Sequence, residues 1–200
     1  MFKLSKGVKA IFYINIAMFL LSIVLAVLNI PILNYLSFWG WDQPYFFPTQ
    51  FITYQFLHAN LMHILFNMIT FISIAPSVES YFSTNRFYIY YLTCGVFSAV
   101  LHTIMVGNED PLVGASGSVF GMLSLFGLLM PNVKLSILFL PIGIKAKYII
   151  ISLFLIEIVS TFISHDNVSH WGHIGGFLTG SLIFLYEKYL AKNVNICRAY

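Results

Sequence analysis

Apolar residues in this chain are gathered into six long segments, which are separated by short polar ones. A helix needs about 20 predominantly apolar residues, with a range of roughly 17 to 25, to cross a hydrocarbon core about 30 Å thick. Each segment reaches that length and is bounded by a charge, a proline or a polar cluster. The pattern predicts an all-α polytopic membrane protein with six transmembrane helices, at about 10–28, 56–75, 87–106, 112–130, 148–164 and 170–186.

The composition favours a membrane protein over a soluble one. Of the 200 residues, 59% are hydrophobic and 8% are charged, and the mean hydropathy is +0.86. An ordinary soluble domain carries about 25% charged residues. Because the sequence contains no repeat, low-complexity tract or separate polar region, residues 1–200 are expected to form a single membrane domain.

The basic residues test the span count, because cytoplasmic loops retain Lys and Arg. With six spans and both termini in the cytoplasm, every basic residue falls on the inside. The outer segments, about 29–55, 107–111 and 165–169, contain none. The formal charge of +3 is therefore a topology signal, and no basic cluster indicates a nucleic-acid surface. The ten residues are Lys3, Lys6, Lys9, Arg86, Lys134, Lys145, Lys147, Lys188, Lys192 and Arg198.

Four polar residues lie near the outer ends of three predicted spans. His63 and Asn67 belong to span two, Ser116 to span four and His173 to span six. At 1.5 Å per residue they lie on the order of 6 to 15 Å below the start of their helices. Each has an ordinary explanation taken alone, as a packing serine, a hydrogen-bonded histidine or a pair that joins two helices. Their shared depth favours a common site.

Two glycine patterns suggest how spans four and six approach each other. Small residues at every fourth position allow two helix backbones to come close. If the spans pack through these residues, Ser116 and His173 meet near the outer end of the contact. The pattern predicts close packing at Gly117 and Gly121 on span four, and at Gly172, Gly176 and Gly180 on span six.

A serine hydroxyl becomes a useful nucleophile when a base within hydrogen-bond reach takes its proton, and histidine is the commonest such base. Ser116 and His173 are the candidate pair, and Phe120, four residues after Ser116, is a candidate to stack on the imidazole. The Ser116 N–H, His63 and Asn67 are candidate donors to an oxyanion. No acidic third member is evident, and Asp166 is the nearest candidate.

The sequence lacks the residues that other classes of intramembrane protease require. No HExxH motif for a zinc protease occurs, and no predicted span holds an Asp for an aspartyl protease. The histidines all fall toward the outer side, but without a clustered carboxylate we expect no metal site. These histidines are His58, His63, His102, His165, His170 and His173.

At these positions the sequence resembles the rhomboid family of intramembrane serine proteases. The shared motifs are HxxxxHxxxN ending at Asn67, GxSG at 114–117, and HxxGxxxG beginning at His173. The resemblance covers essentially the whole chain. It implies a six-helix rhomboid-like bundle, Ser116 as nucleophile, His173 as general base, and an oxyanion site of Ser116, His63 and Asn67. It also implies hydrolysis of membrane-spanning substrates near their extracytoplasmic ends, usually after a small residue and without a cofactor.

The sequence departs from the family pattern in its first outer loop and after the nucleophile. Residues 29–55 contain Trp39 and Trp41 but not the Arg of a frequent Trp-Arg pair, and Phe120 replaces a frequent Tyr. Glu157 lies inside span five, where a hydrogen-bonded structural role is favoured over a gating role. Residues 135–144 are expected to form an interfacial loop, and residues 163–170 a mobile cap over the site.

The sequence therefore favours a serine endopeptidase that acts on single-span membrane proteins in the lipid bilayer. The first alternative is a catalytically inactive rhomboid-like binder or chaperone of membrane helices. A small transporter is a second alternative, but its polar residues would lie at the bilayer midplane. The short chain is most typical of a bacterial cytoplasmic membrane.

Overall fold

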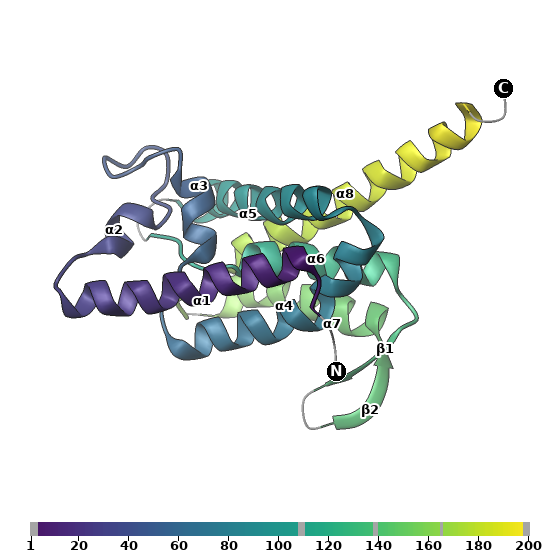
Figure 1. Cartoon of the computed structure of the whole chain (residues 1–200), viewed down its shortest axis with the longest axis horizontal. Coiled ribbons are helices and arrows are strands. Elements are labelled where there is room, and N and C mark those ends of the chain that lie inside the picture. Colours follow the sequence, from purple (N-terminus) through teal and green to yellow (C-terminus); the bar gives the residue numbers. More distant parts are fainter. Residues whose placement is uncertain (1–3, 108–110, 138–139, 165, 198–200) are drawn as a thin grey trace.

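The computed structural model describes residues 4–107, 111–137, 140–164 and 166–197, and it is a bundle of helices (Figure 1). Lys3, Glu109, Asp110, His165 and Arg198 lie outside the described residues. Two very short helices and a turn of 3₁₀ helix, α2, α3 and η1, occupy the outer loop. The elements are α1 Lys6–Val27, α2 Ile32–Leu36, α3 Gln50–Thr53, η1 Tyr54–Phe56, α4 Leu61–Tyr81, α5 Thr84–Val106, α6 Ser116–Leu129, β1 Lys134–Ile137, β2 Leu140–Lys145, α7 Ala146–Ile163 and α8 His170–Cys197.

Four helices of the described chain, α1, α4, α5 and α7, are long and apolar enough to cross a membrane. The helix α6 is apolar but has 14 residues, which at 1.5 Å per residue gives about 21 Å. It lies inside the bundle, in contact with α4, α5, α7 and α8. Helix α8 begins with polar residues and extends beyond the bundle (Figure 1). The molecule is thus a multi-pass membrane protein, in which the six-span count remains a prediction.

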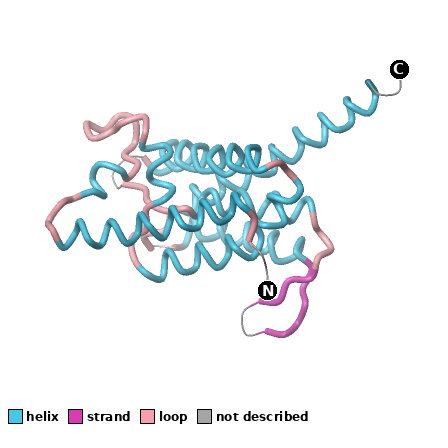
Figure 2. Tube along the Cα trace, viewed as in Figure 1, coloured by secondary structure: helices cyan, strands magenta, loops and turns pink. Residues whose placement is uncertain are grey.

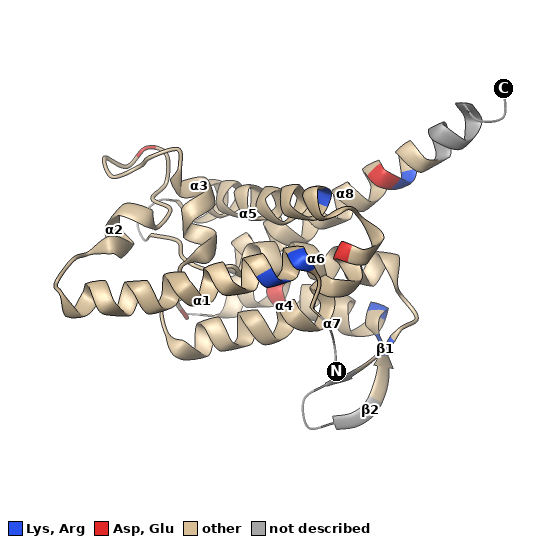
Figure 3. Cartoon of the chain, in the orientation of Figure 1, with Lys and Arg blue, Asp and Glu red and all other residues tan. Residues whose placement is uncertain are grey.

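The described basic residues lie near the starts of α1 and α5, beside the hairpin, and on the part of α8 that extends beyond the bundle (Figure 3). A carboxylate also stabilises the start of α1, because Glu79 of α4 accepts the first free N–H groups of α1. The Gly7 and Val8 N–H groups each donate to it at 2.9 Å, and Ser5 and Thr84 donate their hydroxyls. An acidic group is favourable at a helix N-terminus, where backbone donors have no partner within the helix.

Residues 135–137 and 140–144 lie in strands, whereas an interfacial loop is expected from the sequence. Within the described residues, β1 and β2 pair antiparallel, with Lys134 opposite Lys145 and Leu135 opposite Ile144 (Figure 2). Ten apolar residues are too few to span a bilayer, and pairing the two strands satisfies backbone groups that a loop would leave to water.

The outer loop is held by a buried glutamine instead of an arginine. Gln50 is fully buried, accepts the Trp39 N–H at 3.2 Å, and donates to the Tyr35 and Tyr45 carbonyls at 3.1 and 2.9 Å. The loop also reaches the segment before α6, because Phe38 and Leu112 exchange backbone hydrogen bonds of 3.0 and 2.9 Å. The approach to α6 is therefore fixed by the outer loop.

Candidate active site

The structure brings Ser116 and His173 into contact, although they lie 57 positions apart in the sequence. Ser116 is the first residue of α6 and His173 lies in the first turn of α8. The His173 Nε2 atom is 2.8 Å from the Ser116 Oγ atom, a normal hydrogen-bond distance. His173 is 9% exposed. A buried imidazole that accepts a serine proton is the arrangement that activates a hydroxyl nucleophile.

Glycines produce this contact by letting α6 and α8 touch through their backbones. A Cβ atom on Gly176 would lie 1.9 Å from the Gly117 carbonyl oxygen, and one on Gly180 would lie 2.2 Å from the Gly121 oxygen. Gly117 and Gly121 also face α5, where a Cβ would meet Ser98 and Cys94. Gly172, by contrast, packs against Ser98 and Ser169 more than against α6.

Phe120 lies one turn after Ser116 and stacks on His173. The ring centroids are 4.4 Å apart and the planes differ by 11°. This contact restrains the imidazole plane, because a ring that turned away would lose the stacking. The phenyl ring adds no hydrogen bond, so the orientation within the plane must come from another residue.

The candidate oxyanion donors come from α4 and from the segment before Ser116. Gly114 has a φ of +131°, which L side chains rarely adopt, and a Cβ there would lie 2.9 Å from the His63 Nε2 atom. The His63 ring therefore packs beside the backbone that leads into the nucleophile. Asn67 donates its Nδ2 to the His63 carbonyl at 2.9 Å, so its amide is engaged within α4. The Nδ2 group carries a second N–H, and this N–H is the candidate donor to an oxyanion.

An acidic residue for which the sequence favoured a structural role lies behind His173. The Glu157 Oε2 atom is 3.0 Å from His173 Nδ1 and 2.6 Å from His170 Nδ1. Asp166, the acid nearest in sequence, instead contacts His170 Nε2 at 3.2 Å. The only sequence signal for Glu157 is a carboxylate inside a span, where an ionisable group usually needs a partner. The interface between α7 and α8 supplies that partner.

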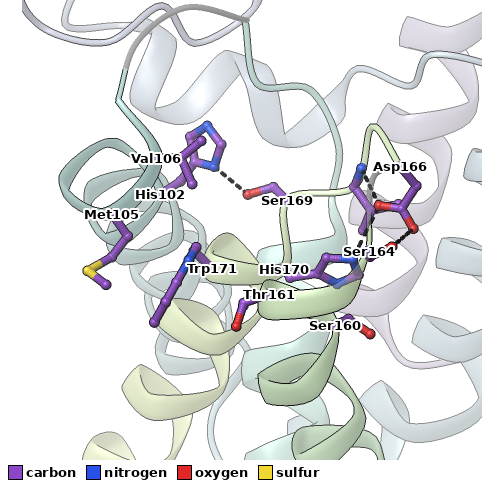
Figure 4. A pocket seen from close by; sticks show the side chains of 11 residues that line it. His102, Met105, Val106, Ser160, Thr161, Ser164, Asp166, Ser169, His170 and Trp171 are labelled. Atoms are coloured by element: carbon purple, nitrogen blue, oxygen red, sulfur yellow. Dashed lines mark hydrogen bonds and ion pairs between the residues drawn. The ribbon is translucent and has the colours of Figure 1, made fainter.

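A pocket of about 220 Å³ lies beside this cluster, between the outer ends of α5, α7 and α8. Figure 4 shows His170 turned toward Asp166 and Ser164 at its edge, and His102 bonded to Ser169 on the other side. The Ser164 hydroxyl donates to Asp166 at 2.7 Å and, with the Val168 N–H, lowers the pKa of this exposed carboxyl. Asp166 is therefore charged at neutral pH, as a partner of His170.

Three ligand-type side chains meet at this place. Glu157, His170 and His173 offer atoms within 4.8 Å of one another, and two histidines with one carboxylate are donors that zinc accepts. The described contacts, however, place the carboxylate oxygen 2.6 and 3.0 Å from the two imidazole nitrogens. The contact with His170 is a hydrogen bond and the contact with His173 is at ion-pair distance, so direct pairing accounts for the cluster.

A family model and the related proteins point to the same family. A family model described as Rhomboid domain matches residues 47–189. RHOMBOID-like protein 2 of Arabidopsis thaliana is 33% identical over 127 residues, covering 63% of this chain and 38% of that protein. Rhomboid protease GluP of Bacillus subtilis is 30% identical over 125 residues, covering 62% and 23%. Putative rhomboid protease YdcA of the same organism is 29% identical over 134 residues, covering 66% and 63%. The matched region is thus less than two thirds of each relative's length.

Proposed function

This chain belongs to the rhomboid family, and we propose that it is an intramembrane serine endopeptidase that cleaves membrane-spanning proteins near their extracytoplasmic ends. The observation that carries the proposal is the 2.8 Å contact between Ser116 Oγ and His173 Nε2 at the outer ends of α6 and α8. Rhomboid proteases among its relatives support the same activity. In this proposal α6 and α8 complete a six-helix domain with both termini in the cytoplasm, in a bacterial cytoplasmic membrane.

The reaction follows from the positions of the two side chains. Ser116 Oγ attacks the scissile carbonyl as His173 Nε2 takes its proton, and the same nitrogen then donates the proton to the leaving amine. The tetrahedral oxyanion is stabilised by the Ser116 N–H, His63 and Asn67. Water then hydrolyses the acyl-enzyme with His173 as base. No step in this scheme requires a cofactor.

Gly114 keeps the His63 ring next to the nucleophile. A Cβ at this position would lie 2.9 Å from the His63 Nε2 atom and 3.7 Å from the Ser116 Oγ atom. In the proposal an extended peptide segment reaches the Ser116 Oγ beside His63. Cleavage after a small residue is part of the proposal because the family resemblance implies it.

The test uses a fluorophosphonate serine probe and a model single-span substrate with the purified full chain in detergent. Ser116→Ala should abolish labelling and cleavage, and His173→Ala should reduce both by at least about 10³-fold. Ser118→Ala is a matched control, because Ser118 is on the same helix but donates to Gln55 at 2.9 Å; its labelling should persist. Undiminished cleavage by Ser116→Ala would refute the proposal. Binding of the substrate helix without labelling or cleavage would favour the inactive binder.

A further inference from the structure

The imidazole of His173 has one nitrogen that the proposed reaction leaves unexplained. For Nε2 to accept the Ser116 proton, the neutral ring must carry its own proton on Nδ1. That Nδ1 atom is buried and has no hydrogen-bond partner among the described residues. A buried donor normally has a partner, and the ring acquires a positive charge during catalysis. A negatively charged acceptor near Nδ1 would meet both needs.

Glu157 occupies the position such an acceptor requires. Its Oε2 atom is 3.0 Å from His173 Nδ1, although the N–H direction is not aligned for a hydrogen bond. Catalytic hydrogen bonds are often loose in the free enzyme and tighten when substrate binds. The side chains of Glu157 and His173 are 13% and 11% exposed, so water screens their attraction little. Distance, burial and charge sign therefore suit a stabilised imidazolium.

A second histidine and an acid in the loop hold Glu157 in place. His170 Nδ1 lies 2.6 Å from the same oxygen, and His170 Nε2 lies 3.2 Å from Asp166 Oδ1. The contacts form a chain from Ser116 through His173, Glu157 and His170 to Asp166. The chain runs from α6 to α8, to α7, back to α8 and then to the loop between α7 and α8. The oxygen that faces His173 is thus also held by His170.

We propose that Glu157 is a positioning residue for His173. Its carboxylate accepts a hydrogen bond from Nδ1–H, which fixes the tautomer whose Nε2 can accept the serine proton, and it stabilises the imidazolium. This inference rests on the proposed function. In the acylation step the Ser116 Oγ–C bond forms as the Oγ proton moves to Nε2. Glu157 stays deprotonated while His173 is positively charged, and the proton leaves with the amine as the peptide C–N bond breaks. Phe120 holds the plane of the ring, and Glu157 sets its direction.

Three substitutions separate a positioning role from a structural one. Glu157→Gln keeps size and polarity but removes the charge, and Glu157→Met is an apolar chain that a membrane helix accepts readily. Both should lower kcat and the rate of probe labelling by on the order of 100-fold, with KM within about threefold. Glu157→Asp keeps the charge and should remain within about tenfold of the wild type. If Glu157 had a merely structural role, the rate of each variant would follow its thermal stability. Glu157→Gln, in which the new side chain has nearly the same shape, would then be faster than Glu157→Asp.

The full chain is measured in detergent, with each rate divided by the folded fraction from size exclusion. Glu187→Gln is the matched control, since Glu187 is a carboxylate of α8 that pairs with Arg86 and Tyr90 away from Ser116; it should label at the wild-type rate. An active wild type with Gln and Met variants within threefold of it would overturn the inference and leave the proposed function standing. A wild type no more active than Ser116→Ala would overturn both.

Discussion

Substituting Gly176 by alanine should disable the site from one turn away, without touching either reacting residue. The added Cβ would lie 1.9 Å from the Gly117 carbonyl oxygen, whereas ordinary contacts begin at 3.4 Å. Because the obstacle is backbone, α6 and α8 must separate by about 1.5 Å or tilt. Overpacking of this kind costs roughly 1–3 kcal/mol of stability. A shift of that size takes Ser116 Oγ and His173 Nε2 from 2.8 Å to beyond hydrogen-bond reach.

A displacement of about 1 Å between reacting groups can cost on the order of 100-fold in rate, so we expect at least that loss for Gly176→Ala. The assay is the rate of fluorophosphonate labelling, followed in parallel with thermal unfolding. Gly127→Ala on the facing helix α6 is the control, because its Cβ would meet the movable end of the Ile150 side chain at 2.7 Å instead of backbone. Wild-type labelling by Gly176→Ala would show that the α6–α8 contact does not set the geometry of the site.

Three further predictions follow from contacts at other positions. Asn67→Ala should slow cleavage roughly a hundredfold, because an oxyanion donor contributes about 2.7–4 kcal/mol; a near-normal kcat would remove Asn67 from the site. Phe120→Leu should slow labelling about two- to tenfold, since an aromatic contact contributes about 0.5–1.5 kcal/mol, whereas Phe120→Tyr should label normally. Glu79→Ala should lower the free energy of unfolding by about 2 kcal/mol by removing the acceptor for Gly7 and Val8, while activity per folded molecule is unchanged.

Helix positions could be predicted from the apolar segments, and so could the start of α8 at His170, but the start of α6 could not. The predicted fourth span begins at 112, whereas α6 begins at Ser116. Leu112 pairs with Phe38, and Gly114 donates to the Tyr54 carbonyl, so the four residues before Ser116 lie in extended or irregular backbone. Hydropathy does not distinguish irregular backbone from helix here, because a short apolar segment buried inside a bundle has the same composition as the end of a membrane helix.

The residues of the candidate site differ in how far the sequence could place them. Ser116 and His173 stand out because a polar group at membrane depth is costly and both occur beside glycines. The spacing of glycines does not tell which neighbouring helix each one faces. Gly172 continues the spacing of Gly176 and Gly180, but it faces α5. Spacing identifies a face of a helix, and the neighbouring helix on that face depends on how the whole bundle packs.

Glu157 shows the limit of the same reasoning most clearly. A carboxylate within a lipid-facing helix demands a partner, and that demand could be predicted, but no periodicity connects α7 to the start of α8. Proximity in sequence favours Asp166, whose position in the loop instead directs it to His170. Helix α7 is among the least enclosed of the four long apolar helices, with 11% of its apolar window buried, so its polar contacts to His170 and His173 are a specific tie to the bundle. Any outward movement of α7 would therefore separate Glu157 from His173 and leave the buried Nδ1 without an acidic neighbour. The position of this lipid-facing helix thus determines whether the His173 imidazole has a carboxylate beside it.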